Sequence, residues 1–277
     1  MGTLYLVATP IGNLEDLSPR AARILSEASL IAAEDTRVTR KLLTHFDIHT
    51  PLTSYFEHNK LTKLDTILNG LNKGDVALVS DAGTPTINDP GYELVRAALG
   101  AGHTVSPVPG PSAAVAALAA SGLPTDSFLY LGYLPRKSSE RLTLANQVAY
   151  LNHTLIFLES PYRLLAALKD LQEGLGDRQI AIARELTKLH EEIWRGSISG
   201  ARGYFTQNQP RGEFTLVIAG SRTEEGSTWT KDNVEIALKV GLRLGESPSA
   251  LAGRVAQESG WERRDVYKFA VKLKGTI

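Results

Sequence analysis

The sequence predicts an α/β protein made of two α/β units and a small helical extension at the carboxyl end. In the first half, short β-rich runs alternate with helical patterns, which is typical of α/β layering around a largely parallel sheet. The alternation returns in the second half, and beyond Gly220 only helical patterns remain. A chain of 277 residues with 43% hydrophobic and 22% charged residues is long enough, and ordinary enough in composition, for two compact domains.

The first half contains helices with recognisable starts. Ser18 precedes Pro19 and Asp89 precedes Pro90, so each pair offers a capping side chain just before a proline that suits the first helical position. A further helix is expected near Val38, and an alanine-rich helix is expected to begin near Ala113 and to end before the break at Ser121. The expected strands cover residues 4–8, 30–33 and 76–80.

A break rich in turn residues, 121–126, separates the two halves and marks a predicted domain limit. After it, Ser160-Pro161 marks the start of another helix. The expected strands of the second half cover residues 128–132, 154–159, 179–184 and 214–219.

The polar stretch from Ser221 to Thr228 is predicted to be a linker to the helical extension. In that extension Ser247-Pro248 starts a helix, Gly260 stops it, and residues 264–273 form another. The predicted domains are therefore residues 1–123, 124–222 and 223–277.

The balance of charges and the absence of cysteine exclude several classes of function. Thirty basic residues match thirty acidic ones, so any surface that binds anions must be local. Without cysteine there is no disulfide, no thiolate nucleophile and no sulfur-containing zinc site, and the six histidines lack metal-ligand spacing, so no metal is expected. The first twelve residues lack the basic start of a signal peptide, and no run approaches about 20 apolar residues. We expect a cytoplasmic protein without a membrane partner.

Three long turns follow or precede elements of the first unit and are candidates for a ligand site. They cover residues 9–14, 80–91 and 107–113, and they could converge on one crevice at the carboxyl ends of the strands. None matches the glycine patterns that cradle phosphates, so a nucleoside triphosphate is disfavoured. The small pair Ser112-Ala113 lets an adenine or a ribose approach the backbone closely, and turn carbonyls suit a cationic ligand. Together they favour S-adenosylmethionine (SAM), whose sulfonium is positive and which has no phosphate. The alternative is that these are plain connections in which Asp89 and Ser112 cap helices.

Charged clusters stand at the ends of predicted strands. Glu34-Asp35-Thr36-Arg37 could hold a charged group or act as a base, but Asp35 or Thr36 could equally cap the next helix while Arg37 lies in solvent. Residues 159–163 and 183–188 present the same two alternatives. A different kind of cluster, an excess of basic residues, occurs in residues 247–277 and in the loop 135–139, where phosphate contact competes with an ordinary solvated surface.

Five segments in order closely resemble the ribosomal RNA small subunit methyltransferase I family, the (cytidine-2′-O)-methyltransferase branch of the tetrapyrrole methylase superfamily. The resemblance runs from about residue 3 to residue 219, and the basic tail is similar to that family's extension. It implies SAM bound in an interdomain cleft, a homodimer, and a cytidine near the decoding site of 16S ribosomal RNA as acceptor, in free RNA or in the assembled 30S subunit, with no DNA partner. The segments are residues 4–14, 33–37, 80–91, 108–113 and 159–163.

The resemblance also implies roles for individual residues. Tyr162 stands where many relatives have histidine, which argues against a required acid or base there, and Asn88 replaces a frequent serine. The implied SAM contacts are Pro10, Asp81, Ala82, Gly83, Thr84, Pro85, Ser112, Ala113, Leu158, Glu213 and Phe214. The acceptor side would be lined by Glu34, Asp35, Arg37, Arg184, Glu185 and Lys188. From the two basic regions, rather than from the resemblance, the candidates for RNA contact are Arg136, Lys137, Arg254, Arg263, Arg264 and Lys268.

A ribose 2′-hydroxyl is a weak nucleophile, so a side chain that accepts its proton would add roughly 10²–10⁴-fold to the rate. The sequence leaves Glu34, Asp35, Glu185 and Lys188 as candidates for this role. Two other functions stay open at this point: methylation of a tetrapyrrole or another small molecule, and RNA binding in ribosome assembly without catalysis.

Overall fold

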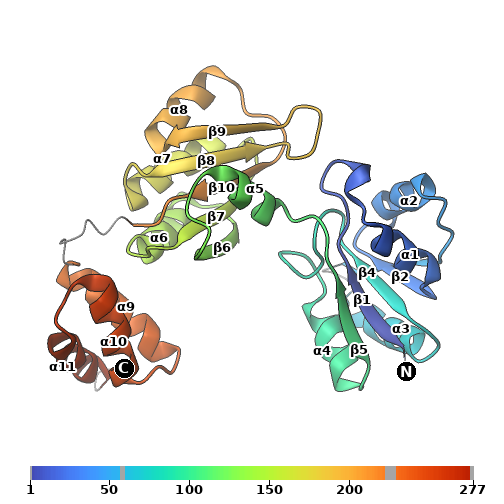
Figure 1. Ribbon diagram of the computed structural model, residues 1–277, viewed down its shortest axis with the longest axis horizontal. Coiled ribbons are helices and arrows are strands. Elements are labelled where there is room, and N and C mark those ends of the chain that lie inside the picture. The colour runs from blue at the N-terminus through green and yellow to red at the C-terminus, as the bar shows by residue number, and fades with distance from the viewer. Residues whose placement is uncertain (1, 57–59, 222–228, 275–277) are drawn as a thin grey trace.

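The computed structural model describes residues 2–56, 60–221 and 229–274, which contain two five-stranded sheets (Figure 1). The first sheet has the strand order β3-β2-β4-β1-β5, and all of its strand pairs are parallel, as predicted. Its strands are β1 (Thr3–Val7), β2 (Leu30–Ala33), β3 (Leu52–Ser54), β4 (Val76–Val79) and β5 (Thr104–Val108).

Helices cover both faces of the first sheet. Side chains alternate along a strand, so Ala77 and Val79 of β4 pack with the cluster under α1 and α2, whereas Val76 and Leu78 pack with α3 and α4. Burial on both faces of a parallel sheet explains why β2 and β4 are continuous apolar runs. The helices are α1 (Pro19–Glu27), α2 (Thr36–His45), α3 (Lys60–Leu71) and α4 (Tyr92–Gly100), with a short 3-10 helix η1 (Leu14–Asp16) before α1.

The second sheet has the order β6-β7-β10-β8-β9 and is mixed. Only β6 and β7 pair in parallel, and the other pairs are antiparallel. The second sheet therefore differs from the first, in which every pair is parallel. One face packs against α6 (Ser138–Val148), α7 (Leu164–Leu175) and α8 (Ile198–Gln207). Its strands are β6 (Phe128–Tyr133), β7 (Thr154–Glu159), β8 (Gln179–Arg184), β9 (Glu192–Ser197) and β10 (Phe214–Ile218).

Helix α5 (Ala113–Ser121) joins the two units. It follows β5 of the first sheet, but Ala117 and Leu118 pack against Ile156, Ala181 and Val217 of the second sheet (Figure 1). The turn before α5 is therefore placed between the sheets. The domain limits at 123/124 and 222/223 stay predictions, and residues 222–228 of the predicted linker lie outside the described residues.

The extension consists of α9 (Lys231–Arg243), α10 (Pro248–Ser259) and α11 (Arg263–Lys274), which share one apolar cluster. The predicted limits of α10 are confirmed, because the Ser247 side chain accepts a hydrogen bond from Ala250 N and Gly260 has a left-handed conformation. Trp229 packs edge-on against Tyr150, with ring centroids 5.2 Å apart, and so attaches the extension to the second unit. In Figure 1 the extension and the first sheet lie at opposite ends of the molecule.

In the two α/β units, two predicted helix starts are wrong and one is confirmed. Ser18 caps α1 by accepting a hydrogen bond from Ala21 N. Asp89 does not cap α4, which begins at Tyr92 after Gly91. The Ser160-Pro161 pair does not start α7 either, because the chain makes a turn before Leu164 in which the Ser160 hydroxyl accepts a hydrogen bond from Arg163. Both misplaced segments lie beside the cavity described below. No helix of the described residues is long and apolar enough to cross a membrane.

Candidate active site

The three long turns of the first unit meet at one place, as predicted. Thr9 and Gly83 form an isolated β-bridge with N–O distances of 2.9 and 3.0 Å, and the Thr84 hydroxyl donates to the carbonyl of Pro111. The turns meet because β1 lies between β4 and β5, and parallel strands present their carboxyl ends at one edge. This edge faces the second sheet.

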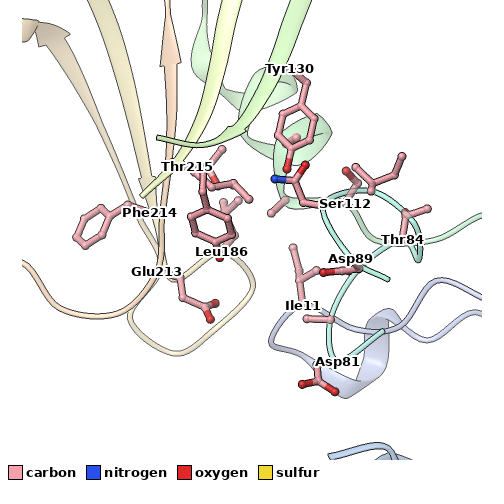
Figure 2. A pocket seen from close by; sticks show the side chains of 18 of the residues that line it. Ile11, Asp81, Thr84, Asp89, Ser112, Tyr130, Leu186, Glu213, Phe214 and Thr215 are labelled. Carbon is pink, nitrogen blue, oxygen red and sulfur yellow. The ribbon is translucent and has the colours of Figure 1, made fainter. Parts of the chain in front are cut away.

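A cavity of about 290 Å³ lies between this edge and the second sheet. Figure 2 shows Leu186, Glu213 and Thr215 on one side of it, and Ile11, Asp81 and Asp89 on the other. Its volume is close to the lower end of the range for small-molecule sites, roughly 300–1,000 Å³. The second sheet and α5 contribute Ser112, Ala113, Ala114, Tyr130, Tyr133, Leu158, Glu159, Ala183, Leu186, Glu213, Phe214 and Thr215.

Most of the residues that the sequence associates with SAM line this cavity. Two do not: Pro10 lines a neighbouring chamber, and Pro85 lines neither space. Those that line the cavity are Asp81, Ala82, Gly83, Thr84, Ser112, Ala113, Leu158, Glu213 and Phe214.

The cavity is acidic. Its described lining contains five carboxylates and no lysine or arginine. A phosphate group would meet only like charges here, whereas a cation such as a sulfonium or ammonium group would be attracted. Glu159 also has an unused acceptor: its buried Oε2 has no hydrogen-bond partner among the described residues, while Oε1 binds Arg163 and Ser160 N. The lining therefore fits SAM, which has two cationic groups and no phosphate. The carboxylates are Glu34, Asp81, Asp89, Glu159 and Glu213.

Burial raises the pKa of three carboxyls in the lining, those of Glu34, Asp81 and Asp89. For Asp89, burial and, to a smaller extent, the nearby carboxylate of Glu34 together raise the pKa to about 6. Burial likewise raises the pKa of Glu34, although its carboxylate accepts a hydrogen bond from Asp81 N at 3.2 Å. The sequence predicts Asp89 only as a helix cap, because an aspartate followed by proline is a common helix start. The position of Asp89 in the turn 80–91 is the signal that could have shown its place in the site.

Asp35 and Arg37 form a local pair rather than part of the cavity lining. The Asp35 side chain caps α2 by accepting from Arg37 N, and it binds the Arg37 guanidinium at 2.6 Å. Hydrogen bonds from Arg37 lower the pKa of Asp35 to about 2. The Arg37 side chain is 86% exposed, so the alternative of a capped helix beside a solvated arginine describes both residues.

Glu185, Lys188 and Glu213 form a cluster at the mouth of the cleft. Lys188 Nζ lies 3.1 Å from Glu185 Oε1 and 3.1 Å from Glu213 Oε2. Partial burial acts to lower the pKa of Lys188, but the hydrogen bonds that its Nζ donates to both carboxylates raise it, so the amine stays protonated. The partnership with Lys188 and Glu213 N lowers the pKa of Glu185, although burial acts in the opposite direction. Arg184 points elsewhere, to Glu192 and to the carbonyl of Arg211.

A chamber of about 400 Å³ adjoins the acidic cavity. The two spaces share Ile11, Asp81, Ala82 and Glu213 as lining residues. The rest of the chamber is mainly the turn after β1 and the first turns of α2, with Lys188 at its edge. It is lined in addition by Thr9, Pro10, Gly12, Leu14, Val38, Thr39, Lys41, Leu42, Ser80 and Lys188.

The basic residues suggested for RNA contact are spread over two regions outside the cleft. Lys137, beside Arg136 in the loop before α6, pairs with Glu140 at 3.1 Å. On α10, Arg254 pairs with Glu246 and Glu258, which compensates its charge. On α11, Arg263 and Arg264 stand at the start of the helix, and Lys268 is 3.9 Å from Asp265.

Comparison with known proteins agrees with this geometry. Residues 3–201 match the family described as Tetrapyrrole (Corrin/Porphyrin) Methylases. A protein of Synechocystis sp. named ribosomal RNA small subunit methyltransferase I is 48% identical over 99% of this chain and 99% of its own length. A protein of Escherichia coli O157:H7 with the same name is 43% identical over 99% and 96% of the two chains.

The chain belongs to the ribosomal RNA small subunit methyltransferase I family. Members of the wider tetrapyrrole methylase family use SAM as methyl donor, so this chain is a SAM-dependent methyltransferase. Solved structures support the fold: the methyltransferase CobJ superposes with a TM-score of 0.58 at 20% identity, covering 80% of this chain and 95% of its own. The uroporphyrin-III-C-methyltransferase of Thermus thermophilus gives a TM-score of 0.52 at 21% identity, covering 78% and 94%.

Proposed function

We propose that this chain transfers a methyl group from SAM to the ribose 2′-oxygen of a cytidine in small-subunit ribosomal RNA. The observation that carries the proposal is the acidic cavity, whose described lining contains no lysine or arginine, together with the chamber that adjoins it. Two adjoining spaces are what a transfer between two substrates requires. The names of relatives that match nearly the whole chain support RNA as the acceptor.

The acidic cavity is proposed to hold SAM. When bound, SAM supplies an electrophilic methyl group on a sulfonium. Ser112 and Ala113 allow close approach of a ligand to the backbone, and Asp81 and Glu213 attract its positive charges. The free Oε2 of Glu159 can accept a hydrogen bond from an amine or a hydroxyl of the ligand. Pro10 and Pro85 are proposed to act by shaping the turns.

Glu34 is proposed to accept the proton of the 2′-hydroxyl. The other candidates are Asp35, Glu185 and Lys188. Among the three carboxyls, only that of Glu34 has a raised pKa, which makes it a stronger base. Asp35 is neutralised by Arg37, and Glu185 by Lys188. Lys188 is held as a cation, so it cannot accept a proton at neutral pH. Lys188 is better suited to orient Glu185 and Glu213 at the mouth of the cleft.

Further features of the proposal concern the setting of the reaction. We propose the decoding-site region of the 30S subunit as the acceptor, a homodimer as the active assembly, and the cytoplasm as the place of action. Arg136, Lys137, Arg263, Arg264 and Lys268 are proposed to add phosphate contacts, and Arg254 less so because its charge is already compensated. A relative from Thermotoga maritima is matched over 99% of its length by only 221 residues, 79% of this chain. We therefore propose that the helical extension assists RNA binding without being required for catalysis.

The proposal is tested by incubating the purified protein with radiolabelled SAM and purified small ribosomal subunits, followed by nuclease digestion and mass spectrometry. Label on a ribose 2′-oxygen is the expected result. Two controls use naked small-subunit RNA and a tetrapyrrole as acceptors. Label on the tetrapyrrole alone would overturn the RNA assignment. SAM binding without transfer to any acceptor would favour a non-catalytic assembly factor.

A further inference from the structure

Helix α2 presents an exposed basic face beside the cleft. Arg37, Arg40, Lys41 and His45 are exposed, and the helix contains no acidic residue. Asp35 compensates Arg37, but Arg40 and Lys41 form no ion pair with a carboxylate in the described part of the chain. Because the formal net charge of the protein is +0, a surface that attracts anions must be local, and these two unpaired cations provide one.

This face is hollowed into a shallow groove, which has Lys41 in common with the chamber of the cleft. Arg37, Arg40, Lys41, Thr44 and His45 line it. Lys41 also lines the chamber, which in turn shares Asp81 and other residues with the acidic cavity. The cavity, the chamber and the groove are therefore neighbours in this order, because each has at least one lining residue in common with the next.

The chamber itself has apolar walls of a kind that suits a planar base. Leu14 and Val38 are each 40% exposed although both are large apolar residues, and both line the chamber together with Pro10. RNA-modifying proteins commonly take an unpaired base out of its stack and hold it against such surfaces while cations bind the backbone. The chamber could hold the base and ribose of one nucleotide, and the basic groove next to it could hold the phosphates of the same strand.

We infer that the acceptor nucleoside occupies the chamber and that phosphates of the RNA strand beside it bind Arg40 and Lys41 in the α2 groove. This inference rests on the proposed function and adds the location of the RNA backbone. The extension lies at the opposite end of the molecule from the first sheet, so its cations are less well placed to hold nucleotides adjacent to the acceptor (Figure 1). Arg40 and Lys41 would supply contacts at the site itself.

The test compares the wild-type protein with the variant Arg40→Gln/Lys41→Gln in methyl transfer to purified small ribosomal subunits. We expect the KM for subunits to rise at least about tenfold, which corresponds to about 1.4 kcal/mol, with little change in the Kd for SAM. The dependence of RNA affinity on salt should also weaken. Its log–log slope should fall by about 1.4, since each single-strand phosphate contact contributes about 0.7.

The matched control is Arg96→Gln/Lys169→Gln, which removes the same charge from exposed sites on α4 and α7 that line none of these spaces. It should leave both KM and the salt slope near the wild-type values. If the two double variants behave alike while the wild type methylates RNA, the α2 inference is wrong and the proposed function stands. If the wild type transfers no methyl group to RNA, the proposed function fails first.

Discussion

Asn88, in the turn after β4, packs directly against Gly132 of β6. A Cβ built on Gly132 would lie 2.1 Å from Nδ2 of Asn88, so the contact requires the absence of a side chain there. Both residues have a positive φ, 63° for Asn88 and 66° for Gly132, and asparagine tolerates this conformation better than most residues. The contact joins the two units at the lining of the acidic cavity and sets how closely they approach.

Substitution of Gly132 by alanine should therefore weaken SAM binding as well as the fold. Gly132→Ala should cost about 1–2 kcal/mol of stability because of the left-handed backbone. Displacement of Asn88 should in addition raise the Kd for SAM by about tenfold. Gly122→Ala is the control, because Gly122 also has a positive φ of 78° but has no neighbour within 4 Å of a built Cβ. Calorimetric titration should show a normal SAM affinity for the control; an equal loss in both variants would refute the role of the contact.

The acidity of Asp89 predicts how stability depends on pH. Because burial raises its pKa to about 6, the folded protein keeps this proton at pH values where the unfolded chain has lost it. The contribution of Asp89 to stability is thus present below about pH 4 and is lost as the pH rises towards 6. Asp89→Asn does not titrate, so its melting temperature should equal that of the wild type near pH 4 and exceed it at pH 7. Thermal melts across this range, with the exposed Asp126→Asn as control, test the sign; a variant less stable at pH 7 would contradict it.

Glu34→Gln tests the proposed proton acceptor. The amide keeps the shape and can still accept a hydrogen bond from Asp81 N, but it cannot take up a proton. We expect kcat for methyl transfer to fall by about 10²–10⁴-fold. The Kd for SAM should change by less than about tenfold. Asp35→Asn, one residue away, should reduce kcat much less because Asp35 binds Arg37. Single-turnover assays would contradict the assignment if Glu34→Gln retained the wild-type rate.

The buried ion pair between Arg141 and Asp170 should dominate the stability of the loop before α6. Both side chains are less than 10% exposed, the charged atoms are 2.6 Å apart, and Arg141 also donates to the carbonyls of Pro135 and Arg136. Arg141→Leu leaves Asp170 buried without its partner and should cost about 3–5 kcal/mol in urea unfolding. Arg23→Leu breaks an equally short but exposed pair with Glu27 and should cost less than about 1 kcal/mol. Similar losses of unfolding free energy in the two variants would show that the burial of an ion pair does not determine its contribution to stability.

Arg263 and Arg264 at the start of α11 form no ion pair with a carboxylate among the described residues, so they allow the role of the extension to be measured. Arg263→Gln/Arg264→Gln should weaken binding to small-subunit RNA and lower the salt slope by about 1.4 if each contacts a phosphate. Arg254→Gln removes a charge already paired with Glu246 and should have a smaller effect. Filter-binding titrations at several salt concentrations provide the readout. Unchanged slopes in both variants would exclude the extension from phosphate contact.

Much of the first unit was predictable because its signals are local. The apolar runs of β2 and β4 and the Ser18-Pro19 cap depend on neighbours within a few residues, and the structure confirms them. The meeting of three turns was also predictable, since adjacent parallel strands end at one edge. The predicted helix caps at Asp89 and Ser160 were wrong for the converse reason. The backbone at these residues turns beside the cavity instead of starting a helix, and a local sequence pattern does not predict such a turn. The mixed, mainly antiparallel pairing of the second sheet likewise depends on contacts between strands that are distant in the sequence.

The amino-acid order was thus sufficient for the α/β class, the helical extension, the family and most of the residues near the methyl donor, because these depend on short periodicities and contiguous motifs. The protonation of Glu34, Asp89 and Lys188 could not be read from it, because burial and the approach of partners 25 or more positions away set those charges. The same holds for Tyr130, Tyr133 and Thr215, which line the cavity only because the second sheet folds back over the turns of the first. Long-range packing supplies the desolvation and the electrostatic neighbours that turn these side chains into a site.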